Sequence, residues 1–282
     1  MKILFIIILS VMSTISVTAK KNIEPKDLYV YERGKEHSQT ILFLHGSGSS
    51  SIMWLKHIAV LESSFHCIAP DLPGHGRSNQ IEWTNLDHVS DIIAELIKSK
   101  SKGKVHVVGL SLGGSLIYKL LEKYPDLLDK VIIDGASAVP IKWSAFIIFG
   151  VNLTSPFLKS NMMLKIMAKN LGIPDNEFAS FKEDFTMVSI KAFRKAMSQA
   201  NRQRIDLKNI TFNHPVFFVS GEKESASMHN SHKIVSKQLP QSECAFYPGK
   251  GHAWMVSDNN THIQLVKYWL LNEPFPEQLK HF

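Results

Sequence analysis

Ser111 is the residue with the clearest chemical potential, because it lies between two glycines in the sequence Gly109-Leu110-Ser111-Leu112-Gly113. A run typical of a buried strand, Val105 to Val108, precedes this pentapeptide, and a helix-forming run, SLIYKLLEKY, follows it. Strand, G-x-S-x-G and helix together indicate a sharp turn that holds the serine in a strained conformation, with its hydroxyl above a sheet. The N–H of Leu112 would then point to the position where an oxyanion forms. The alternative is a glycine-rich turn whose serine only caps the helix.

The segments around this turn predict an alternation of strands and helices, because short apolar runs alternate with amphipathic ones. The expected strands are residues 28–31, 40–44, 65–69, 105–108, 131–134, 216–220 and 243–247. The expected helices are residues 54–61, 86–98, 112–124, 228–239 and 261–271. Such an alternation predicts an α/β fold with a mostly parallel central sheet and helices on both faces.

Residues 138–210 interrupt the alternation with helical periodicity, and they begin with an apolar run at residues 143–149. We therefore expect one α/β core, formed by residues 20–137 and 211–282, with an inserted helical cap between them. The apolar run, together with Trp54 and Trp254, could line a pocket or simply pack in the core.

The first residues of the chain predict an export signal. Lys2 provides a positive start, residues 3–9 form an apolar core, and Val17-Thr18-Ala19 has the small residues of a cleavage site. We expect cleavage after Ala19, which would make the protein periplasmic or secreted. A membrane anchor that is not cleaved is the alternative.

Composition narrows the classes of partner. A hydrophobic content of 44% and a charged content of 20% in 282 residues describe an ordinary globular protein. The net charge of +7 suits an anionic surface or substrate, so a membrane surface is a candidate partner. No nucleic-acid-binding module and no metal-ligand spacing occurs in the sequence, and we expect neither nucleic acid nor a metal or other cofactor. Cys67 and Cys244 are expected to be free thiols, and no pattern indicates the oligomeric state.

Four motifs occur in a specific order: HGSG at residues 45–48, DLPGHGRS at 71–78, GLSLG at 109–113 and GKGHAW at 249–254. On these motifs, residues 27–272 resemble the α/β-hydrolase fold superfamily. The resemblance is greatest to the capped serine hydrolase branch, which includes esterases, lipase-like enzymes and carbon–carbon bond hydrolases.

The resemblance implies a triad in the chain order serine, acid, histidine. It identifies Ser111 as the nucleophile and His252, in the glycine-rich loop after the last strand, as the base. Glu224, three residues after Gly221, stands where the family usually carries its acid as aspartate. Asp134, at the end of the preceding core strand, is the alternative acid.

The resemblance also implies an oxyanion hole formed by the backbone N–H groups of Leu112 and Ser47, and it implies a structural rather than catalytic role for His75. The expected activity is cleavage of a small or medium acyl ester through an acyl-enzyme intermediate. A carbon–carbon bond hydrolase, an acyltransferase and a non-catalytic ligand-binding protein are the alternatives.

Overall fold

The computed structural model describes residues 24–282, so the predicted export signal at residues 1–19 lies outside the described residues and stays a prediction. Eight strands form one sheet in the order β1-β3-β2-β4-β5-β6-β7-β8. The strands β2 to β7 run parallel along the sheet, and β1 and β8 pair antiparallel at its two edges. The strands are Val30–Arg33, Thr40–Leu44, His66–Pro70, Val105–Leu110, Leu128–Asp134, Val216–Gly221, Ser242–Tyr247 and Lys280–His281, numbered β1 to β8 in this order. The α/β fold with a mostly parallel sheet is therefore confirmed.

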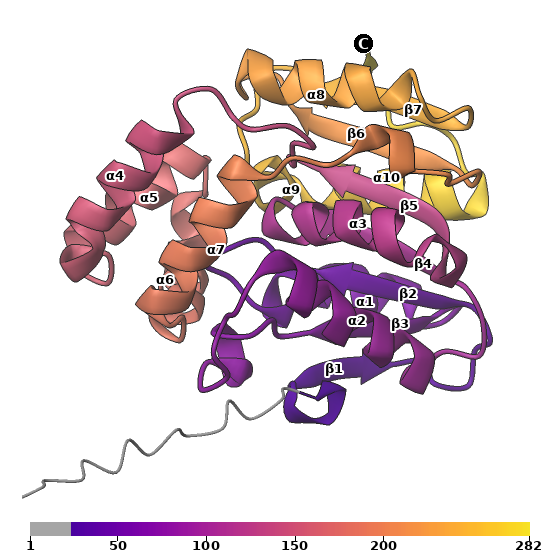
Figure 1. Ribbon diagram of the computed structural model, residues 1–282, viewed down its shortest axis with the longest axis horizontal. Helices are drawn as coiled ribbons and strands as arrows, with labels where there is room; N and C mark the ends of the chain where they lie inside the picture. Colours follow the sequence, from indigo (N-terminus) through magenta and orange to yellow (C-terminus); the bar gives the residue numbers. More distant parts are fainter. Residues whose placement is uncertain (1–23) are drawn as a thin grey trace, which may run out of the picture.

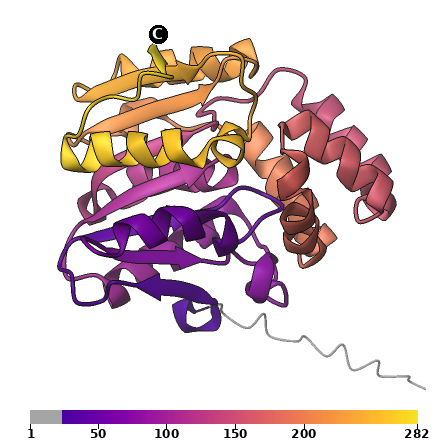
Figure 2. The same ribbon diagram turned by 180° about the vertical axis from the view of Figure 1, so that it is seen from behind.

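Helices cover both faces of this sheet (Figures 1 and 2). One face carries α2 (Leu86–Lys100), α3 (Leu112–Lys123) and α8 (Ala226–Ser236). The other face carries α1 (Leu55–Leu61), α9 (Trp254–Ser257) and α10 (Asn259–Leu271).

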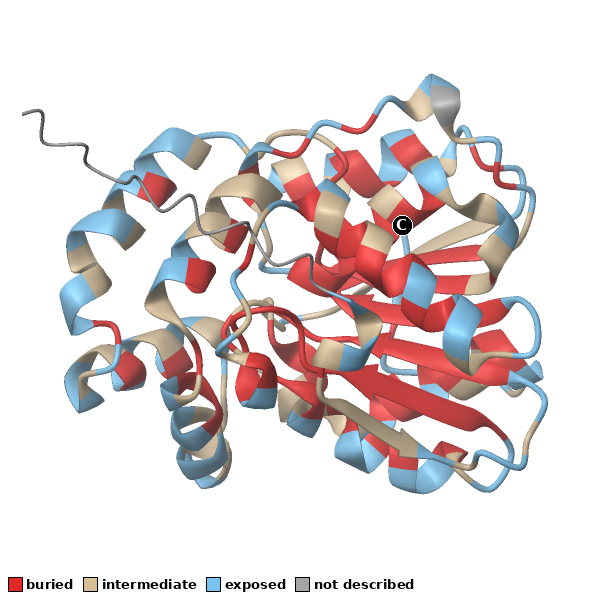
Figure 3. Ribbon diagram, turned by 60° about the horizontal axis from the view of Figure 1, so that its bottom comes forward, coloured by how far each residue is buried: buried red, intermediate tan, exposed pale blue. Residues whose placement is uncertain are grey.

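The central strands are buried on both faces because their apolar side chains alternate between the two helical layers. In β2, Leu42 and Leu44 pack toward α2 and α3, whereas Ile41 and Phe43 pack toward α1 and α10. The strands accordingly form the most buried part of the molecule (Figure 3). This double burial explains why the core strands read as continuous apolar runs in the sequence.

Between β5 and β6 the chain forms a block of four α-helices beside the carboxyl edge of the sheet (Figure 1). These helices are α4 (Ser144–Thr154), α5 (Asn161–Leu171), α6 (Phe178–Thr186) and α7 (Ile190–Arg202). The chain leaves and re-enters the core at neighbouring points, because the N–H of Ile205 donates to the carbonyl of Ala138 at 2.9 Å. We call residues 138–210 the helical block.

The structure differs from the sequence expectation mainly at the edges of elements. The edge strand begins at Val30, two residues later than expected, and β5 begins at Leu128, three residues earlier. The short helix α9 and the strand β8 carried no recognisable sequence pattern because they comprise four and two residues. Within residues 24–282, no helix is long and apolar enough to cross a bilayer.

Candidate active site

Ser111 lies in the turn between β4 and α3, at the carboxyl edge of the sheet. Its φ of 55° falls in the left-handed region, which residues other than glycine rarely adopt. The strained turn is held by the neighbouring strand, because the N–H of Ser111 donates to the carbonyl of Asp134 at 2.8 Å. Backbone strain of this kind is concentrated at functional sites, where the surrounding structure maintains it.

The glycine at position 113 allows α3 to start directly beside β2. A Cβ at Gly113 would lie 2.1 Å from the carbonyl oxygen of Leu44, a distance that no side chain can occupy. Leu112 is the first residue of α3, so its N–H has no acceptor within the helix. This N–H is therefore a backbone donor next to the hydroxyl of Ser111.

His252 and Glu224 come from two loops at the same edge of the sheet, after β7 and β6 respectively. Nδ1 of His252 and Oε2 of Glu224 are 2.9 Å apart. The two loops meet closely at Gly221, where a Cβ would lie only 2.4 Å from the carbonyl oxygen of Gly251. Glycine at this position thus permits the contact between imidazole and carboxylate.

The pKa values of His252 and Glu224 shift as expected for an ion pair: that of the imidazole is raised and that of the carboxyl is lowered. Burial alone would lower the pKa of His252, but the charge of Glu224 and its hydrogen bond raise that pKa to about 9. Burial alone would raise the pKa of Glu224, yet the imidazole holds it below the ordinary value. The carboxylate therefore favours protonated imidazole, the form that a general base reaches in the transition state.

Asp134, the alternative acid, belongs to a different set of polar contacts, with Trp254 and His262. Its Oδ1 accepts a hydrogen bond from Nε1 of Trp254 at 3.1 Å, and its Oδ2 lies 3.6 Å from Nε2 of His262. The ring of His262 in turn shares a 2.8 Å hydrogen bond with Nε2 of His57. Burial, followed by the charge of Glu224, raises the pKa of Asp134 well above its ordinary value. The geometry favours Glu224 over Asp134 as the partner of the imidazole.

The loop after β2 brings Ser47 to the same edge, and the segment at residues 71–78 supports it. The carboxylate of Asp71 accepts a hydrogen bond from the N–H of Ser51 at 2.7 Å. Nε2 of His45 accepts one from the N–H of Leu72 at 2.9 Å. These two contacts fix the loop at both ends, so the backbone around Ser47 is held relative to Ser111.

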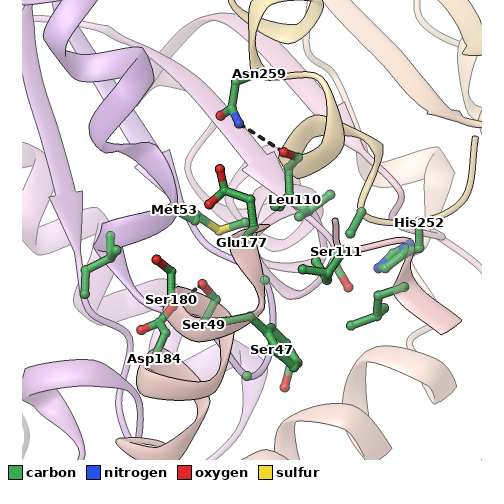
Figure 4. A pocket seen from close by; sticks show the side chains of 18 of the residues that line it. Ser47, Ser49, Met53, Leu110, Ser111, Glu177, Ser180, Asp184, His252 and Asn259 are labelled. Carbon is green, nitrogen blue, oxygen red and sulfur yellow. Dashed lines mark hydrogen bonds between the residues drawn. The ribbon is translucent and has the colours of Figure 1, made fainter. Parts of the chain in front are cut away.

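Two cavities meet at Ser111 and share its neighbours Ser47 and His252. The first has a volume of about 320 Å³ and lies between the core and the helical block. Figure 4 shows Ser111 and His252 together on one side of it, with Asp184 on the other. Its apolar lining comes from Ile52, Met53, Leu171, Ile173, Phe181 and Val256.

The second cavity, of about 280 Å³, lies on the other side of the serine. It contains more hydroxyl and amide groups, because Ser115, Ser137, Asn201 and Ser225 contribute to its lining. Glu224 also contributes. The nucleophile candidate is thus flanked by one largely apolar space and one more polar space.

The sequence-predicted residues separate into those at the cavities and those in the core. His75 is fully buried, and its Nδ1 lies 3.0 Å from the carbonyl of Pro73, which agrees with the structural role implied for it. Trp54 and Trp254 are buried in the core and line neither cavity. Of the apolar run at residues 143–149, only Ile147 reaches a cavity.

Several lining residues carried no recognisable signal in the sequence. Met53, Leu171 and Phe181 come from three separate segments and meet only in the folded chain. Asp184, at the end of α6, is also part of the first cavity and was not a candidate. A lone aspartate in a helix with mixed composition is indistinguishable from a solvated surface charge by sequence alone.

Comparisons with known proteins agree with this architecture. A family model described as the alpha/beta hydrolase fold matches residues 39–162, a segment that contains Ser111. The chain is similar to an AB hydrolase superfamily protein of Gibberella zeae, with 24% identity covering 88% of this chain and 85% of that protein. It is also similar to lipase 1 of Psychrobacter immobilis, with 25% identity covering 82% of this chain and 76% of the lipase.

Among solved structures, an enol-lactonase from Burkholderia xenovorans LB400 superimposes with a TM-score of 0.76. The alignment covers 87% of this chain and 96% of the enol-lactonase, at 14% sequence identity. At this identity the similarity concerns the fold and carries no information on the substrate.

Proposed function

Because the chain belongs to the α/β-hydrolase fold superfamily, we propose that it is a serine hydrolase that cleaves a small or medium acyl ester. The observation that carries the proposal is the meeting of two cavities at Ser111, next to the imidazole of His252. An ester has an acyl part and an alcohol part on either side of its reactive carbon, and each part needs a separate space.

In the proposed mechanism, Nε2 of His252 accepts the hydroxyl proton of Ser111 while the serine oxygen attacks the acyl carbon. Glu224 accepts a hydrogen bond from Nδ1–H and stabilises the imidazolium that forms. The backbone N–H groups of Leu112 and Ser47 stabilise the negative oxygen of the tetrahedral intermediate.

The imidazolium then gives its proton to the departing alcohol, which leaves an acyl-enzyme on Ser111. Water attacks this ester with His252 again acting as base, and the acid product leaves while the serine hydroxyl is restored. Each proton taken from a nucleophile is thereby returned to a leaving group, and no cofactor is required by the scheme.

The two cavities support an assignment of the substrate's parts. The apolar lining of the larger cavity suits the acyl chain, because its burial there removes hydrocarbon from water. The hydroxyl and amide groups of the smaller cavity suit the alcohol part or the attacking water. The volume of the larger cavity, about 320 Å³, suits an acyl group of small or medium size.

The helical block contributes walls to both cavities, and in this proposal it acts as a cap that selects the substrate. Leu171, Ile173 and Phe181 line the larger cavity, and Met197 lines the smaller one. A change in the block should therefore alter the preference for acyl length, while the chemical groups of the core stay in place.

Labelling with a fluorophosphonate tests the nucleophile. The probe should modify the wild-type protein at Ser111 and leave Ser111→Ala unmodified, because only an activated serine attacks the phosphorus readily. Ser115→Ala is a matched control, because Ser115 is a second serine that lines the smaller cavity. This variant should still be labelled. Labelling that persists in Ser111→Ala would place the nucleophile elsewhere.

Hydrolysis of p-nitrophenyl esters of increasing acyl length tests the substrate class. We expect turnover with short and medium chains, a fall with long chains, and a loss of roughly 10³-fold or more in Ser111→Ala. Addition of a primary alcohol distinguishes the acyltransferase alternative, since a transferase would give mainly the new ester. A protein that is not labelled and turns over no ester would be the ligand-binding alternative.

A further inference from the structure

The outer end of the helical block is formed by α4 and α5, on the left of Figure 1. Several large apolar side chains of these elements are exposed. In α4, Phe146 is 75% exposed, Leu153 67% and Phe149 63%, and Trp143 at its N-cap is 72% exposed. We use the name outer face for these residues and their neighbours in η5 (Ser155–Phe157) and α5. The members of the outer face are Trp143, Phe146, Phe149, Leu153, Phe157, Met162 and Ile166.

The arrangement of these residues along α4 forms a stripe. Phe146, Phe149 and Leu153 follow one another at intervals of three and four residues, which places them on one side of α4, and Trp143 precedes them at the N-cap. The opposite side of α4 carries Ile148, the buried residue of this helix. A helix that buries one side chain and exposes four large apolar ones leaves a surface that water solvates poorly.

The charge of the same segment has a single sign. Residues 138–172 contain Lys142, Lys159, Lys165 and Lys169, and they contain no aspartate or glutamate. All four lysines are exposed, and within residues 24–282 none of them pairs with a carboxylate. In α5, Lys165 and Lys169 lie on the side that also carries Met162 and Ile166, because the positions 162, 165, 166 and 169 follow the i, i+3, i+4, i+7 spacing of one helix face.

Exposed aromatic and aliphatic side chains beside unpaired lysines match the chemistry of an anionic bilayer surface. The apolar side chains can enter the boundary between headgroups and acyl chains, while the lysines contact lipid phosphates. A second copy of this chain fits less well, since the two lysine sets would repel each other. With 11 residues, α4 is too short to span a bilayer, for which about 20 residues are needed.

We propose that the outer face docks on an anionic lipid bilayer. The proposal goes beyond the hydrolytic function and does not depend on it, because its evidence is the composition and exposure of α4, η5 and α5. The elements of the outer face also continue into the cavity walls, where Ile147 of α4 and Leu171 of α5 are lining residues. Docking would therefore bring the entrance region of the cavities near the lipid surface.

Trp143 provides a direct readout of docking. The other four tryptophans, Trp54, Trp83, Trp254 and Trp269, are at most 8% exposed, so Trp143 is the tryptophan that can sense a change of solvent. Vesicles of phosphatidylcholine and phosphatidylglycerol in equal parts should shift the emission of the full chain to shorter wavelength. The shift should disappear in Trp143→Phe. An emission spectrum that does not respond to the vesicles would overturn the proposal.

Co-sedimentation with the same vesicles tests the apolar and the basic parts separately. We expect Phe146→Ser/Phe149→Ser to weaken binding by roughly tenfold or more, since two aromatic rings that enter the bilayer on docking are lost. Val60→Ser/Ile234→Ser, which changes two apolar residues at 44% and 45% exposure on α1 and α8, is the control and should bind as wild type. All variants keep residues 1–19, so any affinity of that segment is common to them.

For the basic part, Lys165→Glu/Lys169→Glu should weaken binding by roughly tenfold or more and reduce its dependence on salt. Lys102→Glu/Lys237→Glu makes the same change in net charge at two exposed lysines of the core and serves as the control. Equal losses in both double variants would mean attraction by net charge alone, and that result would overturn the proposal. It would also be overturned if the outer-face variants changed only the self-association measured by sedimentation velocity.

Discussion

At the scale of single residues, the environment of His252 determines how the proposed base behaves. Glu224 raises the pKa of the imidazole to about 9, above the ordinary value of the histidine side chain. A general base must be neutral before it accepts a proton, so at neutral pH only a minority of molecules would be ready for the reaction. The expected consequence is an activity that increases with pH up to about the pKa of His252.

Replacement of Glu224 by glutamine tests this dependence. We expect Glu224→Gln to lower turnover by roughly 10²–10⁴, because the imidazole loses both its oriented acceptor and the compensating charge. The pH at which kcat/KM rises should move to lower values, since the charge that raised the pKa of His252 is removed. The measurement is the profile of kcat/KM against pH with a p-nitrophenyl ester.

Asp134→Asn is the matched comparison, because it removes the other nearby carboxylate. We expect it to change turnover much less and to shift the pH of the rise less than Glu224→Gln does, since Asp134 bonds to Trp254 and adds less than Glu224 to the raised pKa of His252. A larger loss in Asp134→Asn than in Glu224→Gln would assign the role of triad acid to Asp134.

At the scale of elements, one carboxylate of α6 connects the helical block to the loop after β2. Oδ2 of Asp184 accepts hydrogen bonds from the hydroxyl of Ser49 at 2.6 Å and from the N–H of Ser50 at 3.0 Å. Asp184 is only 6% exposed, so these contacts are protected from water. Because Ser47 belongs to the same loop, a shift of α6 would alter the position of the proposed oxyanion donor.

Removal of this carboxylate should reduce the rate of the chemical step. We expect Asp184→Ala to lower kcat roughly tenfold with little change in KM, because a small displacement of an oxyanion donor costs transition-state stabilisation. Asp184→Asn should keep most of the activity, since its amide oxygen can accept the same two hydrogen bonds. Steady-state kinetics on one short ester measures both parameters.

The ion pair between Lys191 of α7 and Glu82 of the core, 3.1 Å apart, offers a control contact between the core and the helical block. Lys191→Met removes it, and kcat should stay close to wild type, because neither residue lines a cavity or touches the loop after β2. Equal effects in Asp184→Ala and Lys191→Met would indicate a general loosening of the helical block and contradict the specific role of Asp184.

At the scale of the whole molecule, five histidines within residues 24–282 have no exposed surface: His45, His57, His75, His232 and His262. Burial lowers the pKa of each, to about 4 for His45 and His232 and to about 3 for His75 and His262. In the unfolded chain the same side chains titrate near 6.5. The unfolded state therefore binds more protons between these values, and acid favours unfolding.

The melting temperature should fall by several degrees between about pH 7 and about pH 5. Each of these histidines contributes a slope of up to roughly 1.4 kcal/mol per pH unit over the range in which only the unfolded state is protonated. The raised pKa values of the buried carboxyls Asp134 and Asp184 act in the opposite direction and offset part of this effect. Thermal unfolding followed by circular dichroism gives the measurement.

The variant His232→Gln removes one titrating group and keeps a donor for the carbonyl of Ala136, which lies 2.9 Å from Nε2 of His232. The dependence of the melting temperature on pH should become shallower in this variant. A melting temperature that is constant between about pH 7 and about pH 5 would contradict the linkage to buried histidines.

The sequence by itself was sufficient to predict the architecture, and it supplied the candidate residues of the site as predictions. Core strands buried on both faces give continuous apolar runs such as Thr40–Leu44, and the strand–turn–helix around Ser111 is a local pattern. Motifs of this kind are contiguous, because the backbone geometry that they impose extends over only a few residues. The resemblance to the α/β-hydrolase fold superfamily implied the roles of His252 and Glu224, and the two side chains lie 2.9 Å apart in the folded chain.

Only the tertiary structure showed which of the two carboxylates contacts His252, and only it identified the surroundings of the site. Asp134 and Glu224 both follow core strands, but the register of β5 and the packing of α9 direct Asp134 to Trp254. Met53, Phe181 and Asp184 meet across contacts between distant segments, which periodicity along the chain does not encode. The exposure of Phe146 likewise depends on whether a neighbouring element covers its side of α4, and a hydrophobic run has the same sequence signature in either case.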